Sequence, residues 1–340
     1  MHMIQFESRG AFAAALADLP AANKVALAAA QLRQNALTKP LGSLGRLEDI
    51  AIFMASWQDR ERPRLDRIRA AIFAGNHGIA ARGLSTYPAE VTAQMVANFA
   101  AGGAAINAMA DACGAELVIV PIELERPTAD FVEEPAMSEG DCLAAINAGA
   151  GVVEDGLDLL FVGEMGIGNT TPAAALCAQS CKGAVEDWVG AGTGLEMDGV
   201  LRKRIVVSLA LACHGPACND AFETLRRLGG REIAAMAGAI LAARMKRIPV
   251  LLDGYIACAS IAPLVADQPQ FAAHCLAAHC SAEAGHLRLL DWLGLEPLLR
   301  LGMRLGEGTG AAVATQLVRS AIAAHNGMAT FAEARVSQAQ

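Results

Sequence analysis

Glu307 is the acid in the sequence RLGEGTGA, where it stands between two glycines and just before an alanine-rich stretch. Glutamate is an unusual residue for a tight glycine turn, which asparagine or aspartate fits better. At the start of a helix the dipole favours an ionised carboxylate. These residues leave two roles open for Glu307. It caps the helix, or it accepts a proton in a pocket where partial burial raises its pKa.

A second candidate site is the stretch GEMGIGNTTPAAAL, residues 163–176, where an apolar segment runs into glycines and then a helical segment. Pro172 suits the first turn of that helix, and Thr170 or Thr171 suits its cap. Free backbone N–H groups at such a start can bind an anion. The spacing matches neither a Walker loop nor G-x-G-x-x-G. The stretch is therefore a loop for a mononucleotide phosphate or an ordinary strand-to-helix turn.

Two other stretches of the sequence also contain candidate site residues. The flexible stretch GAGTGL is followed shortly afterwards by Arg202, Lys203 and Arg204. One of these cations neutralises a bound phosphate or carboxylate, or the three form a charged surface. Earlier in the chain, Tyr87 is one of only two tyrosines and follows Ser85 and Thr86, which suits a pocket for a flat ring. His77 is either catalytic or a loop histidine that bonds to the backbone.

Composition limits the classes of partner. Of the 340 residues, 54% are hydrophobic and 18% charged, and the net charge of −8 argues against nucleic acid and anionic membranes. No apolar run reaches the about 18 residues of a membrane span, and the first 20 residues lack a signal-peptide pattern, so we expect a cytoplasmic protein.

The nine cysteines contain no paired C-x-x-C unit. Cys177 with Cys181, and the run from His274 to Cys280, could ligate a metal or pack in the core. We expect core packing and no metal.

The elements that must position these residues follow from the apolar pattern. Short apolar runs alternate with alanine-rich helical segments and predict strands at 68–75, 115–122, 157–165, 248–254 and 274–280. Strands that are apolar on both faces and separated by helices indicate an α/β fold with a mostly parallel, Rossmann-like sheet flanked by helices. Ligands bind such sheets at the carboxyl ends of the strands. We expect a large α/β domain at 61–294 and a small helical domain formed by 1–60 and 295–340.

Seven stretches together resemble one family. LTKPLGSLGRLE, GNHGIAARGLSTYPAEVTAQMVANFAAGGAAIN, GEMGIGNTTPAAAL, GAGTG, LLDGYIACAS, HCSAEAGH and RLGEGTGAA follow one another between about residues 30 and 325. In this order they resemble the nicotinate-nucleotide–dimethylbenzimidazole phosphoribosyltransferases. One departure is Asn76, where the family often has aspartate before His-Gly.

The resemblance implies a reaction. The phosphoribosyl group of nicotinate mononucleotide moves to 5,6-dimethylbenzimidazole with inversion at the anomeric carbon, in the assembly of the lower nucleotide loop of cobalamin. It also implies Glu307 as the base, Glu164 as partner of a substrate hydroxyl, and a homodimer. The phosphate is expected near Gly166, Gly168, Asn169, Thr170, Lys203 and Ser281. The benzimidazole is expected beside Thr86, Tyr87, Gln94 and Leu305.

Two rival functions make different predictions. A nucleotide-dependent oxidoreductase needs G-x-G-x-x-G after the first strand, where this chain has AGNHG. A non-catalytic binder would keep the pockets and would not need Glu307. The chain also lacks the adjacent acids followed by Thr-Gly with which enzymes that use phosphoribosyl pyrophosphate hold Mg²⁺, so we expect no metal and no cofactor.

Overall fold

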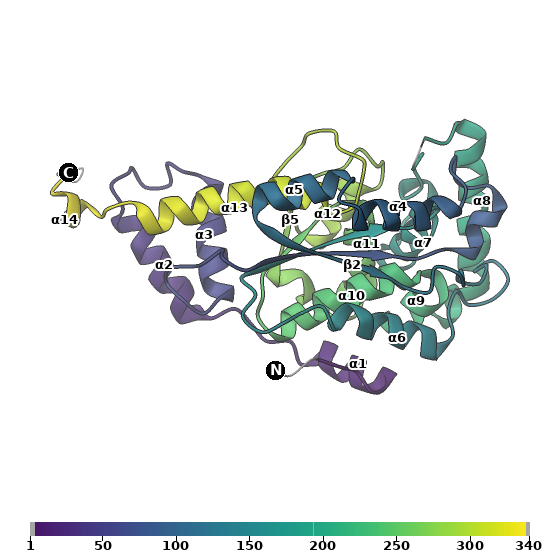
Figure 1. Ribbon diagram of the computed structural model, residues 1–340. Coiled ribbons are helices and arrows are strands. Elements are labelled where there is room, and N and C mark those ends of the chain that lie inside the picture. Colours follow the sequence, from purple (N-terminus) through teal and green to yellow (C-terminus); the bar gives the residue numbers. More distant parts are fainter. Residues whose placement is uncertain (1–3, 193, 338–340) are drawn as a thin grey trace.

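A five-stranded parallel sheet forms the centre of the computed structural model, which describes residues 4–192 and 194–337 (Figure 1). The strand order is β2-β1-β3-β4-β5, and every neighbouring pair is parallel. The strands are β1 (Ile68–Ala74), β2 (Ala115–Pro121), β3 (Leu159–Met165), β4 (Val250–Leu252) and β5 (Cys275–Ala277). Each lies within one of the five predicted apolar runs, so the predicted fold class is confirmed.

The order of the strands determines where a crevice can form. From β1 the chain adds β2 on one side, and it then returns to add β3 on the other side. β1 is fully buried and pairs with β3 from Ile68–Leu159 to Ala74–Met165. Loops that leave the carboxyl ends of strands at such a reversal diverge and leave room for a ligand.

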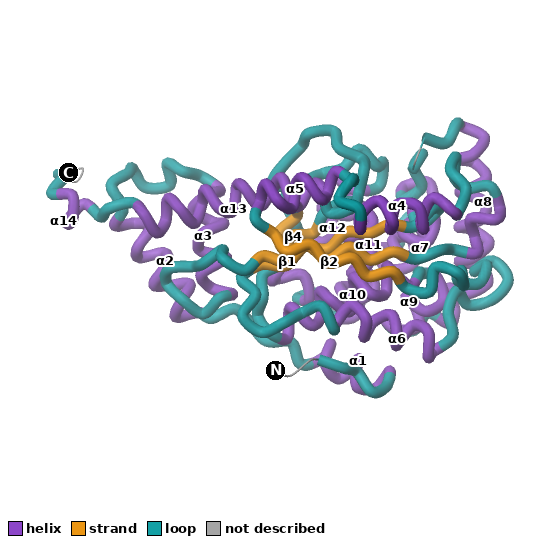
Figure 2. The backbone as a smooth tube through the Cα atoms, viewed as in Figure 1, coloured by secondary structure: helices purple, strands orange, loops and turns teal. Residues whose placement is uncertain are grey.

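Helices cover both faces of the sheet (Figure 2). One layer contains α6 (Glu139–Ala150), α7 (Thr170–Cys181), α9 (Ala221–Leu228), α10 (Arg231–Met245) and α11 (Tyr255–Asp267). The other layer contains α3 (Arg46–Trp57), α4 (Glu90–Ala100), α5 (Ala105–Cys113) and α13 (Thr309–Gly327). The remaining α-helices are α1 (Arg9–Ala17), α2 (Lys24–Ala36), α8 (Met197–His214), α12 (His286–Leu293) and α14 (Phe331–Ala334).

Helices from the two ends of the sequence meet at one end of the molecule (Figure 1). The buried Arg33 of α2 donates hydrogen bonds to the carbonyl oxygens of His325 (2.8 Å), Asn326 (3.2 Å) and Met328 (3.1 Å). α13 packs on α3 there and continues over the sheet as far as β3 and β4. The helical end and the α/β part therefore share α13, and the predicted domain boundaries stay a prediction.

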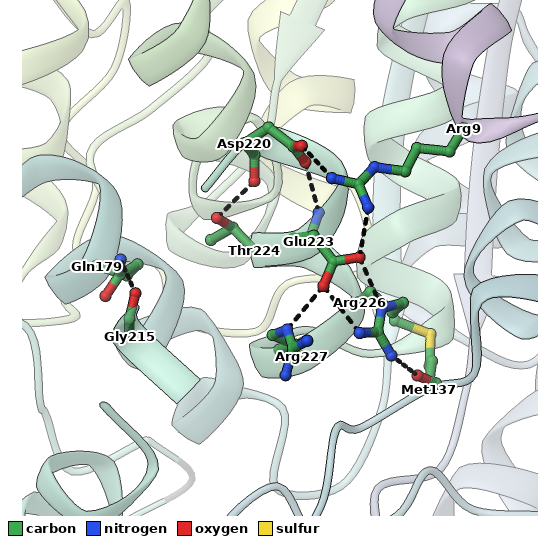
Figure 3. Close-up of polar contacts among 9 residues, drawn as sticks. All are labelled: Arg9, Met137, Gln179, Gly215, Asp220, Glu223, Thr224, Arg226 and Arg227. Atoms are coloured by element: carbon green, nitrogen blue, oxygen red, sulfur yellow. Dashed lines mark hydrogen bonds and ion pairs between the residues drawn. The ribbon is translucent and has the colours of Figure 1, made fainter. Parts of the chain in front are cut away.

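α1 lies apart from this helical end. It packs against α9, where Phe12 meets Phe222 with ring centroids 6.0 Å apart. Arg9 forms ion pairs with Asp220 and Glu223, and Glu223 also binds two arginines of its own helix (Figure 3). This network fixes the first helix to the α/β part of the protein.

Across residues 4–192 and 194–337, no helix is both long enough and apolar enough to cross a membrane.

Candidate active site

A cavity of about 370 Å³ opens at the carboxyl ends of β3, β4 and β5. Eight of the predicted site residues line it: Tyr87, Glu164, Gly166, Asn169, Thr170, Ser281, Leu305 and Glu307. The structure therefore brings together residues from four separate parts of the sequence. Thr86, Gln94, Gly168 and Lys203 are outside the lining.

Glu307 lies in a turn of three consecutive left-handed residues. The φ angles are +82° at Gly306, +61° at Glu307 and +78° at Gly308. This conformation costs a non-glycine residue on the order of 1 kcal/mol. The Glu307 side chain is 5% exposed and lines the cavity, and within the described chain its carboxylate accepts no hydrogen bond. The turn thus holds an unpartnered carboxylate at the cavity wall.

The capping of α13 is done by a different acid. Asp253, directly after β4, accepts hydrogen bonds from the backbone N–H groups of Gly308 (3.1 Å) and Ala311 (2.9 Å). These groups belong to the N-terminus of α13, whose N-cap residue Gly308 has no side chain to serve them. Glu307 is left for another role. Burial raises its pKa to about 7, and the charge of Asp253 adds to the rise.

Glu164 faces the same turn from the end of β3. An added Cβ on Gly306 would lie 2.4 Å from Glu164 Oε1, so carboxylate and backbone are in close contact. Asn169 Nδ2 donates a hydrogen bond to Glu164 Oε2. Burial raises the pKa of Glu164 to about 8 against the effect of that bond, and the charges of Glu232, Asp253 and Glu307 add to the rise. At neutral pH Glu164 is mostly a neutral acid, able to donate a hydrogen bond.

The predicted phosphate loop connects β3 to α7. α7 begins at Thr170, and Asn169 takes the N-cap position with its side chain turned to Glu164. The expected threonine cap is therefore not formed. An added Cβ on Gly166 would lie 2.8 Å from the Gly75 oxygen and 3.0 Å from Glu232, so the loop rests directly on the sheet edge.

His77 packs against this loop outside the cavity lining. Its Nε2 lies 2.7 Å from Glu232 Oε1, and both side chains are fully buried. An added Cβ on Gly166 would lie 3.1 Å from His77 Nε2. The ring does not form the backbone bond considered from sequence, because its partner is a buried carboxylate. The catalytic role considered there stays a prediction.

Lys203 reaches the loop from α8. Its side chain is 1% exposed, and Nζ donates hydrogen bonds to Thr170 Oγ1 (3.0 Å) and to the oxygen of Gly190 (3.2 Å). Burial lowers the pKa of Lys203 to about 8, and the charge of Glu283 opposes this effect. The cation lies immediately behind Thr170, where it can strengthen an anion site at the start of α7.

Ser281 lines the cavity after β5 and is held by a buried histidine. His286 Nδ1 accepts the Ser281 backbone N–H at 2.8 Å, and Ser281 Oγ lies 2.8 Å from the same nitrogen. Burial lowers the pKa of His286 to about 3, so the ring is neutral. Because Nδ1 is an acceptor, the Ser281 hydroxyl donates to it and offers its lone pairs to the cavity.

The cavity mouth is apolar and partly exposed. Tyr87 is 54% exposed and Leu305 is 55% exposed, and Val91 and Met95 of α4 continue the lining between them. Thr86 and Gln94 lie on the same segment with exposed side chains.

Sequence reasoning missed Asp253, Glu232, His279, Glu283 and Arg304, of which all but Glu232 line the cavity. The signal for Asp253 was present in LLDGY, because an acid that directly follows a buried strand lies at the carboxyl edge of the sheet. Nothing local marks Glu232, which reaches this region from the first turn of α10.

The histidines and cysteines considered as metal ligands have other roles in the structure. His274 is fully buried, with its ring nitrogens 3.1 Å and 3.0 Å from the carbonyl oxygens of Phe271 and Ile240. All nine cysteines are free thiols. Among the residues that the structure describes, no three His, Cys, Asp or Glu side chains form a group able to hold a metal.

Comparison with known proteins identifies the family. A family model described as "Phosphoribosyltransferase" matches residues 19–336. The nicotinate-nucleotide–dimethylbenzimidazole phosphoribosyltransferase of Novosphingobium aromaticivorans is 61% identical over 335 residues, covering 98% of this chain and 99% of that protein. The corresponding protein of Mesorhizobium japonicum is 54% identical over 333 residues, with coverage of 98% and 99%. The chain belongs to the nicotinate-nucleotide–dimethylbenzimidazole phosphoribosyltransferase family.

Solved structures of this family share the fold. CobT from Thermus thermophilus matches with a TM-score of 0.87 at 40% identity, covering 93% of this chain and 100% of that chain. A nicotinate-nucleotide–dimethylbenzimidazole phosphoribosyltransferase structure from the same organism matches with a TM-score of 0.86 at 38% identity, with the same coverage. The resemblance that the ordered stretches indicated is confirmed.

The raised pKa of the buried Glu164 predicts how the stability of this phosphoribosyltransferase depends on pH in the absence of ligands. Its folded pKa of about 8 exceeds the ordinary value of 4.5, so its contribution to stability is fully present below 4.5 and is lost progressively as the pH rises from there through 8. We expect Glu164→Gln to match the wild type at pH 5 and to exceed its free energy of unfolding at pH 9 by on the order of 3 kcal/mol. Urea unfolding at both pH values measures this.

The exposed Glu125→Gln is the matched control and should change stability equally little at both pH values. An equal effect of Glu164→Gln at pH 5 and pH 9 would contradict the prediction.

Proposed function

We propose that this enzyme transfers the phosphoribosyl group of nicotinate mononucleotide to 5,6-dimethylbenzimidazole. The products are α-ribazole 5′-phosphate and nicotinate, and the reaction serves assembly of the cobalamin lower ligand. The observation that carries the proposal is Glu307, a buried carboxylate with a pKa of about 7 on the wall of the cavity. Membership of the family indicates the class of substrate, and this residue provides a proton acceptor beside it.

The reaction needs a proton acceptor and no general acid. A bare ring nitrogen of the benzimidazole attacks C1′ as the bond from C1′ to the pyridinium nitrogen breaks. The bonding electrons return to the pyridine ring, so nicotinate leaves without needing a proton there. The alkylated benzimidazole is cationic until its other nitrogen loses its hydrogen. We assign that proton to Glu307, whose pKa lets it be largely ionised at slightly alkaline pH and still hold the proton afterwards.

The nucleotide is assigned to the side of the cavity formed by the loop after β3. Gly166, Asn169 and Thr170 line the cavity at the start of α7, Gly168 belongs to the same loop, Lys203 bonds to Thr170, and Ser281 lines the same cavity. Glu164, protonated at neutral pH, is assigned to a substrate hydroxyl.

The benzimidazole is assigned to the apolar mouth, beside Tyr87 and Leu305. Thr86 and Gln94 remain assigned to its border, although their side chains lie outside the cavity lining. Holding the two flat rings on opposite faces of the ribose gives the in-line geometry that inversion requires. No metal and no cofactor enters this mechanism.

The test of the function is a product assay with Glu307→Gln. Incubation of the wild type with nicotinate mononucleotide and a panel of bases should give α-ribazole 5′-phosphate, identified by mass. Glu307→Gln should lower kcat by about 10²–10⁴-fold because no group then takes the proton. Both ligands should still bind in calorimetry with little loss.

The matched control is Glu296→Gln, which removes an exposed carboxylate whose pair with Arg46 lies at the surface. It should leave the rate unchanged. Wild-type turnover by Glu307→Gln, with both ligands bound, would favour the alternative of a non-catalytic role for this residue.

Lys203 provides a second test, because it separates the two subsites. Lys203→Ala should weaken binding of nicotinate mononucleotide by at least about tenfold, since a charge-assisted contact to the phosphate is lost. Dimethylbenzimidazole binding should change by less than about twofold, and calorimetry with each ligand alone measures both. Arg202→Ala is the control, because it removes an exposed cation from the adjacent position of α8. Equal loss of both ligands in Lys203→Ala would refute the assignment.

A homodimer and a cytoplasmic location are further proposals. Met197, Leu201, Ile205 and Leu209 are exposed at intervals of four residues along α8, and Val25 and Leu32 are exposed on α2. Apolar stripes of this kind are typical of interfaces. Light scattering at micromolar concentration should give twice the chain mass of 35.2 kDa. A monomer mass would exclude the dimer.

A further inference from the structure

Asp253 is a buried carboxylate that the proposed reaction does not use. It follows β4 directly, the residue is 2% exposed, and it lines the cavity beside the Glu307 turn. A buried carboxylate is costly unless its oxygens are bonded, and here both are. Oδ2 accepts from Gly308, 55 residues further along the chain, and Oδ1 accepts from Ala311.

These two bonds fix the position of Glu307. The first is to the residue that follows Glu307, and the second is to the first turn of the helix that Glu307 precedes. On the other side, β3 leaves no room for movement, because an added Cβ on Gly163 would lie 2.4 Å from the carbonyl carbon of Glu307. The left-handed turn is thus held between a strand backbone and a carboxylate.

Several charged or titratable groups face Glu307 from the surrounding elements. Glu164 approaches from β3, Asp253 from the end of β4 and His279 from the end of β5, and Arg304 precedes the turn. His279 Nε2 lies 3.7 Å from Asp253 Oδ1, so it faces the capping carboxylate. The charge of Asp253 raises the pKa of Glu307 beyond the effect of burial.

We propose that Asp253 is a positioning residue that sets both the location and the proton affinity of the Glu307 carboxylate. Its two oxygens hold the turn, and its negative charge disfavours ionisation of Glu307. The resulting base is stronger than a carboxylate placed in the same pocket without this neighbour. The inference rests on the proposed role of Glu307 as the proton acceptor.

The decisive measurement is the pH dependence of kcat in Asp253→Asn. Removal of the negative charge lowers the pKa of Glu307, so the acid limb of the profile should move to lower pH by on the order of one unit. The plateau rate should fall by about tenfold or more, because the base is weaker and its turn has lost one of its two bonds. If Asp253→Asn does not fold, Asp253→Ser is used in its place, because serine is neutral and retains one hydrogen-bond acceptor.

Ser138→Ala is the matched control. Ser138 Oγ caps α6 by accepting the N–H of Asp141 at 3.0 Å, so this variant loses a helix cap outside the cavity. Its acid limb should coincide with that of the wild type. A fall in plateau rate for Asp253→Asn with an unmoved acid limb would overturn the inference and leave a purely structural role.

Glu307→Gln distinguishes a failure of the proposed function from a failure of the role assigned to Asp253. If Glu307→Gln retains the wild-type rate and acid limb, Glu307 is not the base, and the proposed function fails together with the inference. If Glu307→Gln loses the limb and Asp253→Asn leaves it in place, the inference about Asp253 alone is wrong.

Discussion

The site depends on the burial of several carboxylates close together at one edge of a parallel sheet. Glu164, Asp253 and Glu307 arrive there from β3, from the end of β4 and from the turn before α13. Burial penalises the charged form of each and raises all three pKa values. Repulsion from neighbouring carboxylates adds to the rise at Glu164 and Glu307, whereas the charge of His279 and backbone hydrogen bonds oppose it at Asp253. The result at Glu307 is a carboxylate with a pKa of about 7, which suits the proposed acceptance of one proton from the benzimidazole.

That proximity is possible because glycines let backbones meet. A Cβ on Gly163 would lie 2.3 Å from the nitrogen of Gly308, and one on Gly306 would lie 2.4 Å from Glu164 Oε1. Gly166 is pressed in the same way onto Gly75 and the His77–Glu232 pair. The glycines of GEMGIG and GEGTG therefore serve less as flexible joints than as contact points between chain segments. Rigid placement of the carboxylates follows from these contacts.

Much of the fold could be predicted because its signals are local. Each strand lies inside an apolar run, and the alternating helical segments require parallel pairing. The candidate site was predictable in part. The loop after β3 and the turn at Glu307 stood out by composition, whereas the partnership of His77 with Glu232, 155 residues away, left no local trace. Thr86 and Gln94 were named from the family pattern, and the structure leaves their side chains outside the lining.

The sequence by itself determined five strands with helices between them, the family, and a glutamate enclosed by glycines. Only the tertiary structure decided what that glutamate is free to do. Sequence left open whether Glu307 caps α13 or takes up a proton, and the fold supplies Asp253 as the cap. The physical reason is that hydrogen bonding, desolvation and Coulomb repulsion depend on distances in space. Those distances arise between residues that β3, β4 and α13 bring together from distant parts of the chain.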